Sequence, residues 1–145
     1  MTPDAPAGTG SDEVVDLRSA LRALPVDRDV VRVAGPDAVT YLQGQLSQDL
    51  AALAPGDVAW SFVLQPAGKV DAWLRVVRTA DDEVVLDVDG GGGETLIGRL
   101  RRFLLRTKAE VDALDWRTVA IRGPGAEAAA RAAAGGEGAR ADLVV

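Results

Sequence analysis

Two neighbouring runs of the sequence carry charged and aromatic side chains at alternating positions, the spacing of one face of a β-strand. In the first run Asp71, Trp73 and Arg75 alternate with apolar residues, and in the second Asp87 and Asp89 do the same. In adjacent antiparallel strands these side chains would share one side of the sheet. A tryptophan among charges on such a face indicates either a ligand-binding surface or a lid over a second core. The pattern alone leaves both interpretations open.

The absence of two residue types narrows the possible chemistry. The chain contains no Cys and no His, which excludes cysteine nucleophiles, Ser-His triads, disulfides and zinc sites built from His or Cys. A formal net charge of −6 argues against a nucleic-acid partner, because the phosphate backbone requires clustered Lys and Arg. No apolar run is long enough to span a bilayer, and the first residues lack the pattern of a signal peptide. We therefore expect a cytoplasmic protein with no membrane partner, whose oligomeric state the sequence leaves open.

Two further features could hold an anion. Four arginines accompany one predicted helix: Arg99, Arg101, Arg102 and Arg106. They could bind an anionic ligand, but a solvated helix face explains them more simply. The glycines at 90–93 could offer backbone N–H groups to an anion before that helix, or serve as a plain connector.

The elements that must position these residues follow from apolar periodicity. Alternation predicts strands near 30–33, 58–64, 70–78, 83–89 and 108–113. Helical spacing predicts helices near 36–46 and 94–106, each with one apolar stripe, and Leu100 and Phe103 are expected to be deeply buried. The same spacing over Val14, Leu17, Leu21 and Leu24 predicts an earlier helix that Pro25 ends. Together these elements predict an α+β fold, an antiparallel sheet with helices packed on one face.

The chain also contains an internal repeat. Residues 30–38 and 118–126 both read as a strand, a Gly-Pro pair and the start of a helix, at an offset of 88 residues (123 − 35). Such a spacing is typical of a duplicated half-domain rather than a solenoid. We expect a disordered tail over 1–12, an α+β domain over 13–114, and the beginning of a second, incomplete repeat over 115–145.

An ordered set of motifs resembles the YgfZ and glycine-cleavage T-protein superfamily of folate-binding proteins, N-terminal portion only. The motifs are the strand and Gly-Pro turn of 31–38, Tyr41-Leu42, Ser47 to Leu50, the hairpin from Trp60 to Val70, the strand Val85 to Asp89, and Val119 to Ala126. The resemblance covers about residues 30–131 in order and with few gaps. It implies that tetrahydrofolate is the cofactor.

The resemblance also implies site residues. Trp60 stands where the T-protein has a pocket tyrosine, and Asp89 stands where it has a pocket asparagine. Trp73 stands where the aminomethyltransferase has its catalytic aspartate, and a tryptophan cannot supply that carboxylate. Asp71, two positions away, is expected on the same strand face. We predict that Trp60, Trp73, Arg75 and Asp89 line one concave folate surface, with no catalytic residue and no metal.

The loss of the aspartate favours the YgfZ-type relatives over the transferase. These relatives bind tetrahydrofolate and support iron–sulfur enzymes, which implies an iron–sulfur protein as a further partner. They carry a Lys-Gly-Cys-x-Gly-Gln-Glu signature that this sequence does not contain. The leading hypothesis is a non-catalytic YgfZ-like tetrahydrofolate-binding module. The alternatives are an aminomethyltransferase and an interaction scaffold that binds no ligand.

Overall fold

The computed structural model describes residues 18–135. The strands are β1 (Arg22–Val26), β2 (Arg28–Ala34), β3 (Val58–Leu64), β4 (Val70–Ala80), β5 (Glu83–Asp89), β6 (Glu110–Leu114) and β7 (Thr118–Arg122). The helices are α1 (Ala38–Gln43), the 3-10 turn η1 (Leu50–Ala52), α2 (Gly93–Arg101) and α3 (Ala126–Ala134). Among these residues no helix is long and apolar enough to cross a membrane.

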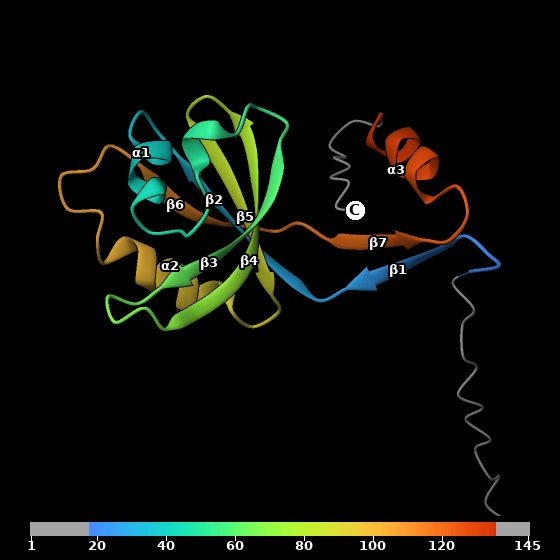
Figure 1. Cartoon of the computed structure of the whole chain (residues 1–145), viewed down its shortest axis with the longest axis horizontal. Helices are drawn as coiled ribbons and strands as arrows, with labels where there is room; N and C mark the ends of the chain where they lie inside the picture. Colours follow the sequence, from blue (N-terminus) through green and yellow to red (C-terminus); the bar gives the residue numbers. More distant parts are fainter. Residues whose placement is uncertain (1–17, 136–145) are drawn as a thin grey trace, which may run out of the picture.

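Five of the strands form one antiparallel sheet in the order β3-β4-β5-β2-β6. Helices α1 and α2 cover one face of this sheet, while β1, β7 and α3 lie on its other side (Figure 1). The α+β class, the antiparallel sheet and the helices on one face are therefore confirmed. The five strands are the five that alternation predicts.

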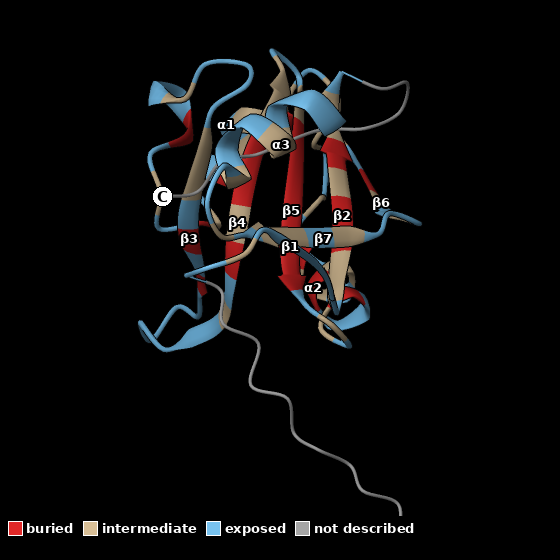
Figure 2. Cartoon of the chain, turned by 90° about the vertical axis from the view of Figure 1, so that its right-hand side faces the viewer, coloured by how far each residue is buried: buried red, intermediate tan, exposed pale blue. Residues whose placement is uncertain are grey.

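The main core lies between the sheet and its two helices. Val31, Leu74 and Leu86 from the central strands are fully buried there against Leu42 of α1 and Leu100 of α2. Figure 2 shows the buried positions concentrated in β2, β4 and β5, whereas β3 alternates between buried and exposed residues. The middle of the sheet is thus the rigid base on which any site must be built.

The two Gly-Pro turns have the same local geometry. At the end of β2, Gly35 has a φ of 136°, and a Cβ there would lie 2.4 Å from the carbonyl oxygen of Lys108. At the end of β7, Gly123 has a φ of 108°, and a Cβ there would lie 2.3 Å from the carbonyl oxygen of Ala20. Both positions therefore require glycine for conformation and for space, and each is followed by a helix.

The predicted helix that Pro25 would end does not form within the residues that the structure describes. Residues 22–26 form β1, which pairs antiparallel with β7, and Leu21 and Leu24 are exposed. Because these leucines bury no common stripe, pairing with a distant strand decides the local structure rather than helical spacing. Val14 and Leu17, the other members of that pattern, lie outside the described residues.

The expected burial of Phe103 is also wrong. Leu100 is fully buried, as predicted, but Phe103 is 44% exposed. Helix α2 ends at Arg101, so the helical spacing no longer applies two residues later. The Phe103 ring instead lies under the guanidinium carbon of Arg99, 4.8 Å from the ring centroid, a cation–π contact on the surface.

Candidate functional site

The face of the sheet opposite α1 and α2 carries the residues that sequence analysis selected. We call it the second face and define it by Trp60 and Phe62 of β3, Trp73 and Arg75 of β4, and Asp87 and Asp89 of β5. Strand register places them together, because Trp60 pairs with Arg75, Arg75 with Asp87, and Phe62 with Trp73. The second face looks toward the β1–β7 ribbon and α3 (Figure 1).

An exposed aromatic pair is the most prominent feature of the second face. The rings of Trp60 and Trp73 have centroids 4.5 Å apart and planes tilted by 31°. The two residues are 40% and 54% exposed, and Phe62 beside them is 42% exposed. Tryptophans left half-exposed on a rigid sheet offer a flat apolar surface on which a planar heterocycle can stack.

The apolar alternation of β3 thus points away from the main core. The buried residues of this strand are Ser61 and Val63, while Trp60, Phe62 and Leu64 face outward. Trp60 and Phe62 share one face of β3 by plain alternation, since the register with β4 is regular between them. Both aromatic residues lie on the second face.

A buried network of charges supports this surface. The carboxylate of Asp87, with its side chain only 6% exposed, accepts hydrogen bonds from Arg28 Nε and Arg75 Nη2. Arg28 Nη2 also donates to the backbone oxygen of Asp87 at 2.9 Å. A buried carboxylate is tolerated when its oxygens are paired in this way. Arg75 therefore fixes the position of Asp87. The guanidinium of Arg75 is already hydrogen-bonded within the protein, without a ligand.

Asp89 is placed differently from Asp87. One carboxylate oxygen of Asp89 pairs with Arg28 Nη1, and the side chain is 80% exposed. Its other oxygen makes no hydrogen bond or ion pair within residues 18–135 and can accept a hydrogen bond from a ligand. Asp89 is thus an anchored, accessible acceptor on the strand next to that of Trp73.

The roles of Arg28 and Asp87 were not predicted from the sequence. Asp87 was placed on the correct face but not selected, and Arg28 lies before the strand predicted over 30–33. The sequence does contain a signal for this network, the pair of Asp87 and Asp89 in a valine-rich strand. A carboxylate buried in such a strand needs a cationic partner. Identifying Arg28 as that cation requires the register that pairs it with Asp89.

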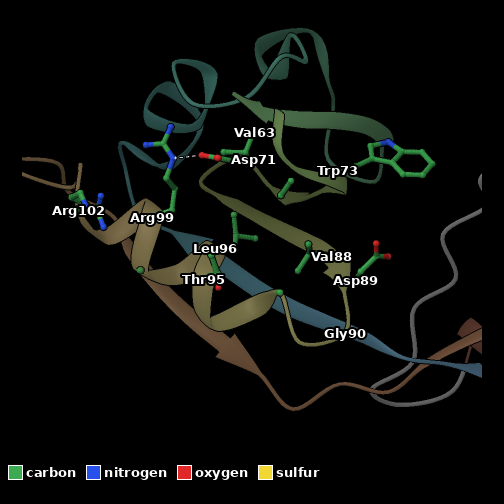
Figure 3. A pocket seen from close by; sticks show the side chains of 13 residues that line it. Val63, Asp71, Trp73, Val88, Asp89, Gly90, Thr95, Leu96, Arg99 and Arg102 are labelled. Atoms are coloured by element: carbon green, nitrogen blue, oxygen red, sulfur yellow. Dashed lines mark hydrogen bonds and ion pairs between the residues drawn. The ribbon is translucent and has the colours of Figure 1, made fainter. Parts of the chain in front are cut away.

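Asp71 does not share the face of Trp73, contrary to expectation. The register of β3 and β4 shifts between Val63 and Leu64, so that Leu64 pairs with Val70 and the strict alternation is lost. Asp71 turns toward α2, where its Oδ2 accepts a hydrogen bond from Arg99 Nε at 3.1 Å (Figure 3). Asp71 therefore cannot replace a carboxylate on the second face.

A groove of about 720 Å³ begins beside Trp73 and Asp89 and runs along α2. Val88 and Leu96 form part of its apolar wall, and Arg99 and Arg102 lie at the end away from Trp73 (Figure 3). The second face and this groove thus share Trp73 and Asp89 as a common border.

The arrangement suits binding of a planar, hydrogen-bonding molecule. It offers a stacking surface and a free carboxylate oxygen, while Asp87 has two arginine partners and is not a free base. Within residues 18–135 no three His, Cys, Asp or Glu side chains are grouped so as to hold a metal ion.

A family model and a solved structure point to the same relationship. The model of the GCVT N-terminal domain matches residues 28–142. The solved structure of glycine cleavage system aminomethyltransferase T from Bartonella henselae is similar with a TM-score of 0.74 and 27% identity, over 82% of this chain and 33% of that one. An uncharacterized protein of Haemophilus influenzae is 29% identical over 94 residues, which are 65% of this chain and 34% of that protein. The chain spans about a third of the length of both relatives.

Proposed function

Since the chain belongs to the GCVT N-terminal domain family, we propose that it binds a reduced folate, tetrahydrofolate, on the second face of its sheet. The observation that carries this proposal is the exposed pair of Trp60 and Trp73 beside the accessible carboxylate of Asp89. The pterin ring stacks on the indoles, and the free oxygen of Asp89 accepts its N–H donors. Arg75 acts indirectly, by fixing Asp87 beneath this surface.

We propose a binding role without catalysis for this chain. In the resemblance described above, aminomethyl transfer uses a carboxylate at the position that Trp73 occupies. Asp71, the candidate replacement, turns to α2 and is held by Arg99 and by Gln65. These two observations favour a non-catalytic module of the YgfZ kind over an aminomethyltransferase.

The resemblance to YgfZ-type proteins extends the proposal to the support of iron–sulfur enzymes. In this role the folate-loaded domain is the active form, and its partner is an iron–sulfur protein. Restoration of iron–sulfur enzyme activity in cells that lack a YgfZ-type protein tests this part separately. A negative result in that assay alone would not contradict folate binding.

The folate proposal is tested by tryptophan fluorescence, because the chain has three tryptophans and two of them form the proposed site. Tetrahydrofolate should quench the emission, after inner-filter correction. The dissociation constant should be near millimolar, about −4 kcal/mol, since an open face covers only one side of the ligand. Trp73→Ala should remove most of the quenching.

Trp116→Ala is the matched control for this experiment. Trp116 is also about half-exposed, at 45%, but it lies in the link between β6 and β7. Its replacement should lower the total emission and leave the ligand-dependent quenching in place. Unchanged emission of the wild-type protein at saturating tetrahydrofolate would leave the interaction scaffold as the better description.

A further inference from the structure

The groove along α2 borders the second face at Trp73 and Asp89. The ladder between β4 and β5 extends only to the pair of Leu74 and Val88, whereas β4 continues to Val70 with β3 as its partner. Below Leu74, β4 therefore has an edge that β5 does not cover. This uncovered edge lies beside Trp73 and Asp89, which also line the groove.

The far end of the groove has one uncompensated positive charge. Arg99 is engaged, because its guanidinium donates to Asp71 at 3.1 Å and to the backbone oxygen of Leu64 at 2.8 Å. Arg102 also lines the groove, and its side chain makes no hydrogen bond or ion pair with any residue in the range 18–135. An exposed guanidinium at the end of an apolar channel favours a ligand with an apolar body and a terminal carboxylate.

The length of the groove can be estimated from α2. The nine residues of this helix rise by about 14 Å at 1.5 Å per residue, and the groove runs from Gly92 before the helix to Arg102 after it. This span suits an aromatic ring linked through an amide to one amino acid. A molecule of this kind with a terminal carboxylate would have its ring against the apolar wall and its carboxylate at Arg102.

We propose that the groove binds the aminobenzoyl-glutamate tail of the folate whose pterin stacks on Trp60 and Trp73. This inference rests on the proposed function and adds to it a second subsite, with Arg102 as the residue that selects the glutamate end. The ligand bends around the uncovered edge of β4. The charge of the tail and the charge of Arg102 are complementary.

Two ligands separate the groove from the pterin surface. The first is tetrahydrofolate, and the second is 6-methyltetrahydropterin, which keeps the reduced ring and lacks the tail. Tetrahydrofolate should bind the wild-type protein about fivefold more tightly, the scale of one partly exposed charge pair. Added salt should reduce this advantage, because it screens the exposed Arg102.

Arg102→Gln should bring the two affinities within about twofold of each other while leaving the pterin affinity unchanged. Arg106→Gln is the matched control, since it removes the same charge from a residue that does not line the groove, and it should keep the advantage. Far-UV circular dichroism and the urea midpoint check that both variants fold.

The outcomes distinguish the two proposals. Equal affinities for both ligands in the wild-type protein, or an advantage that survives Arg102→Gln, overturn the tail subsite and leave the pterin site standing. Absence of binding by both ligands overturns the folate function itself. A salt-sensitive advantage that only Arg102→Gln removes supports the subsite.

Discussion

Asp87 is the residue on which the architecture of the second face depends. Its side chain is 6% exposed and lies between Arg28 and Arg75, which are 13% and 19% exposed. Removing one partner from a buried charge network leaves uncompensated charges that have lost their water. The stability lost on removing one partner is therefore much larger than the net contribution of the intact network to the free energy of unfolding.

We predict that Asp87→Asn lowers the free energy of unfolding by about 3–5 kcal/mol. Asp89→Asn should cost about 1 kcal/mol or less, because the Asp89 side chain is 80% exposed and its ion pair is screened by solvent. Urea denaturation of the two variants at neutral pH measures the difference. Similar losses in both would show that Asp87 does not hold the network together.

At the scale of elements, one hydrogen bond joins the two helices of the main core. The hydroxyl of Tyr41 on α1 donates to the backbone oxygen of Leu100 on α2 at 2.6 Å. Burial raises the pKa of Tyr41 above its usual value of 10.0, and the nearby Arg99 opposes this in part. The folded protein thus holds the phenol proton more tightly than the unfolded chain does.

This raised pKa predicts how stability changes with pH. The contribution of Tyr41 is fully present below pH 10.0 and is lost as the pH rises through the higher pKa of the folded state. Tyr41→Phe should cost about 0.5–1.5 kcal/mol at neutral pH and should flatten the decline above pH 10.0. The chain has one tyrosine, so phenolate absorption reports this group alone. Parallel declines in the two proteins would contradict the prediction.

The strands were predictable because each central strand has a clear apolar face. Leu74 and Val76 alternate with outward-facing residues over β4, and the sheet buries them as expected. The orientation of β3 was not predictable in the same way. Its apolar alternation of Trp60 and Phe62 lies on the second face, and the buried positions include a small polar residue, Ser61.

The candidate site was predictable as a set of residues on one face but not as a network. Trp73, Arg75 and Asp89 follow from strand alternation, and Trp60 from family resemblance. The partners of the charges could not be read from one strand, because Arg28 comes from β2 and reaches Asp87 only through the sheet register. The turn of Asp71 toward α2 depends on a register shift that alternation does not encode.

At the scale of the whole molecule, the five-stranded sheet and the β1–β7 ribbon are supported differently. The sheet and its helices share a core with many fully buried residues, whereas β1 is exposed along its whole length and α3 has no buried residue. A two-stranded ribbon of this kind is marginally stable by itself. We therefore expect local unfolding within residues 18–135, with β7 and α3 unfolding more readily than the sheet.

The two glycine turns allow this difference to be tested with equivalent substitutions. Gly35→Ala and Gly123→Ala each place a Cβ against a backbone oxygen at a positive φ, at a cost of about 1–3 kcal/mol. Gly35 joins β2 to α1, two elements that pack in the main core, so its substitution should lower the urea midpoint of the whole domain. Gly123 joins β7 to α3, so its substitution should speed amide hydrogen exchange in those two elements and leave the protection of β2 and β5 unchanged.

The two substitutions make the same local chemical change, so a difference in response between the variants reports where each turn lies in the fold. Equal loss of protection in β2 and β5 from both variants would mean that ribbon and sheet unfold as one unit.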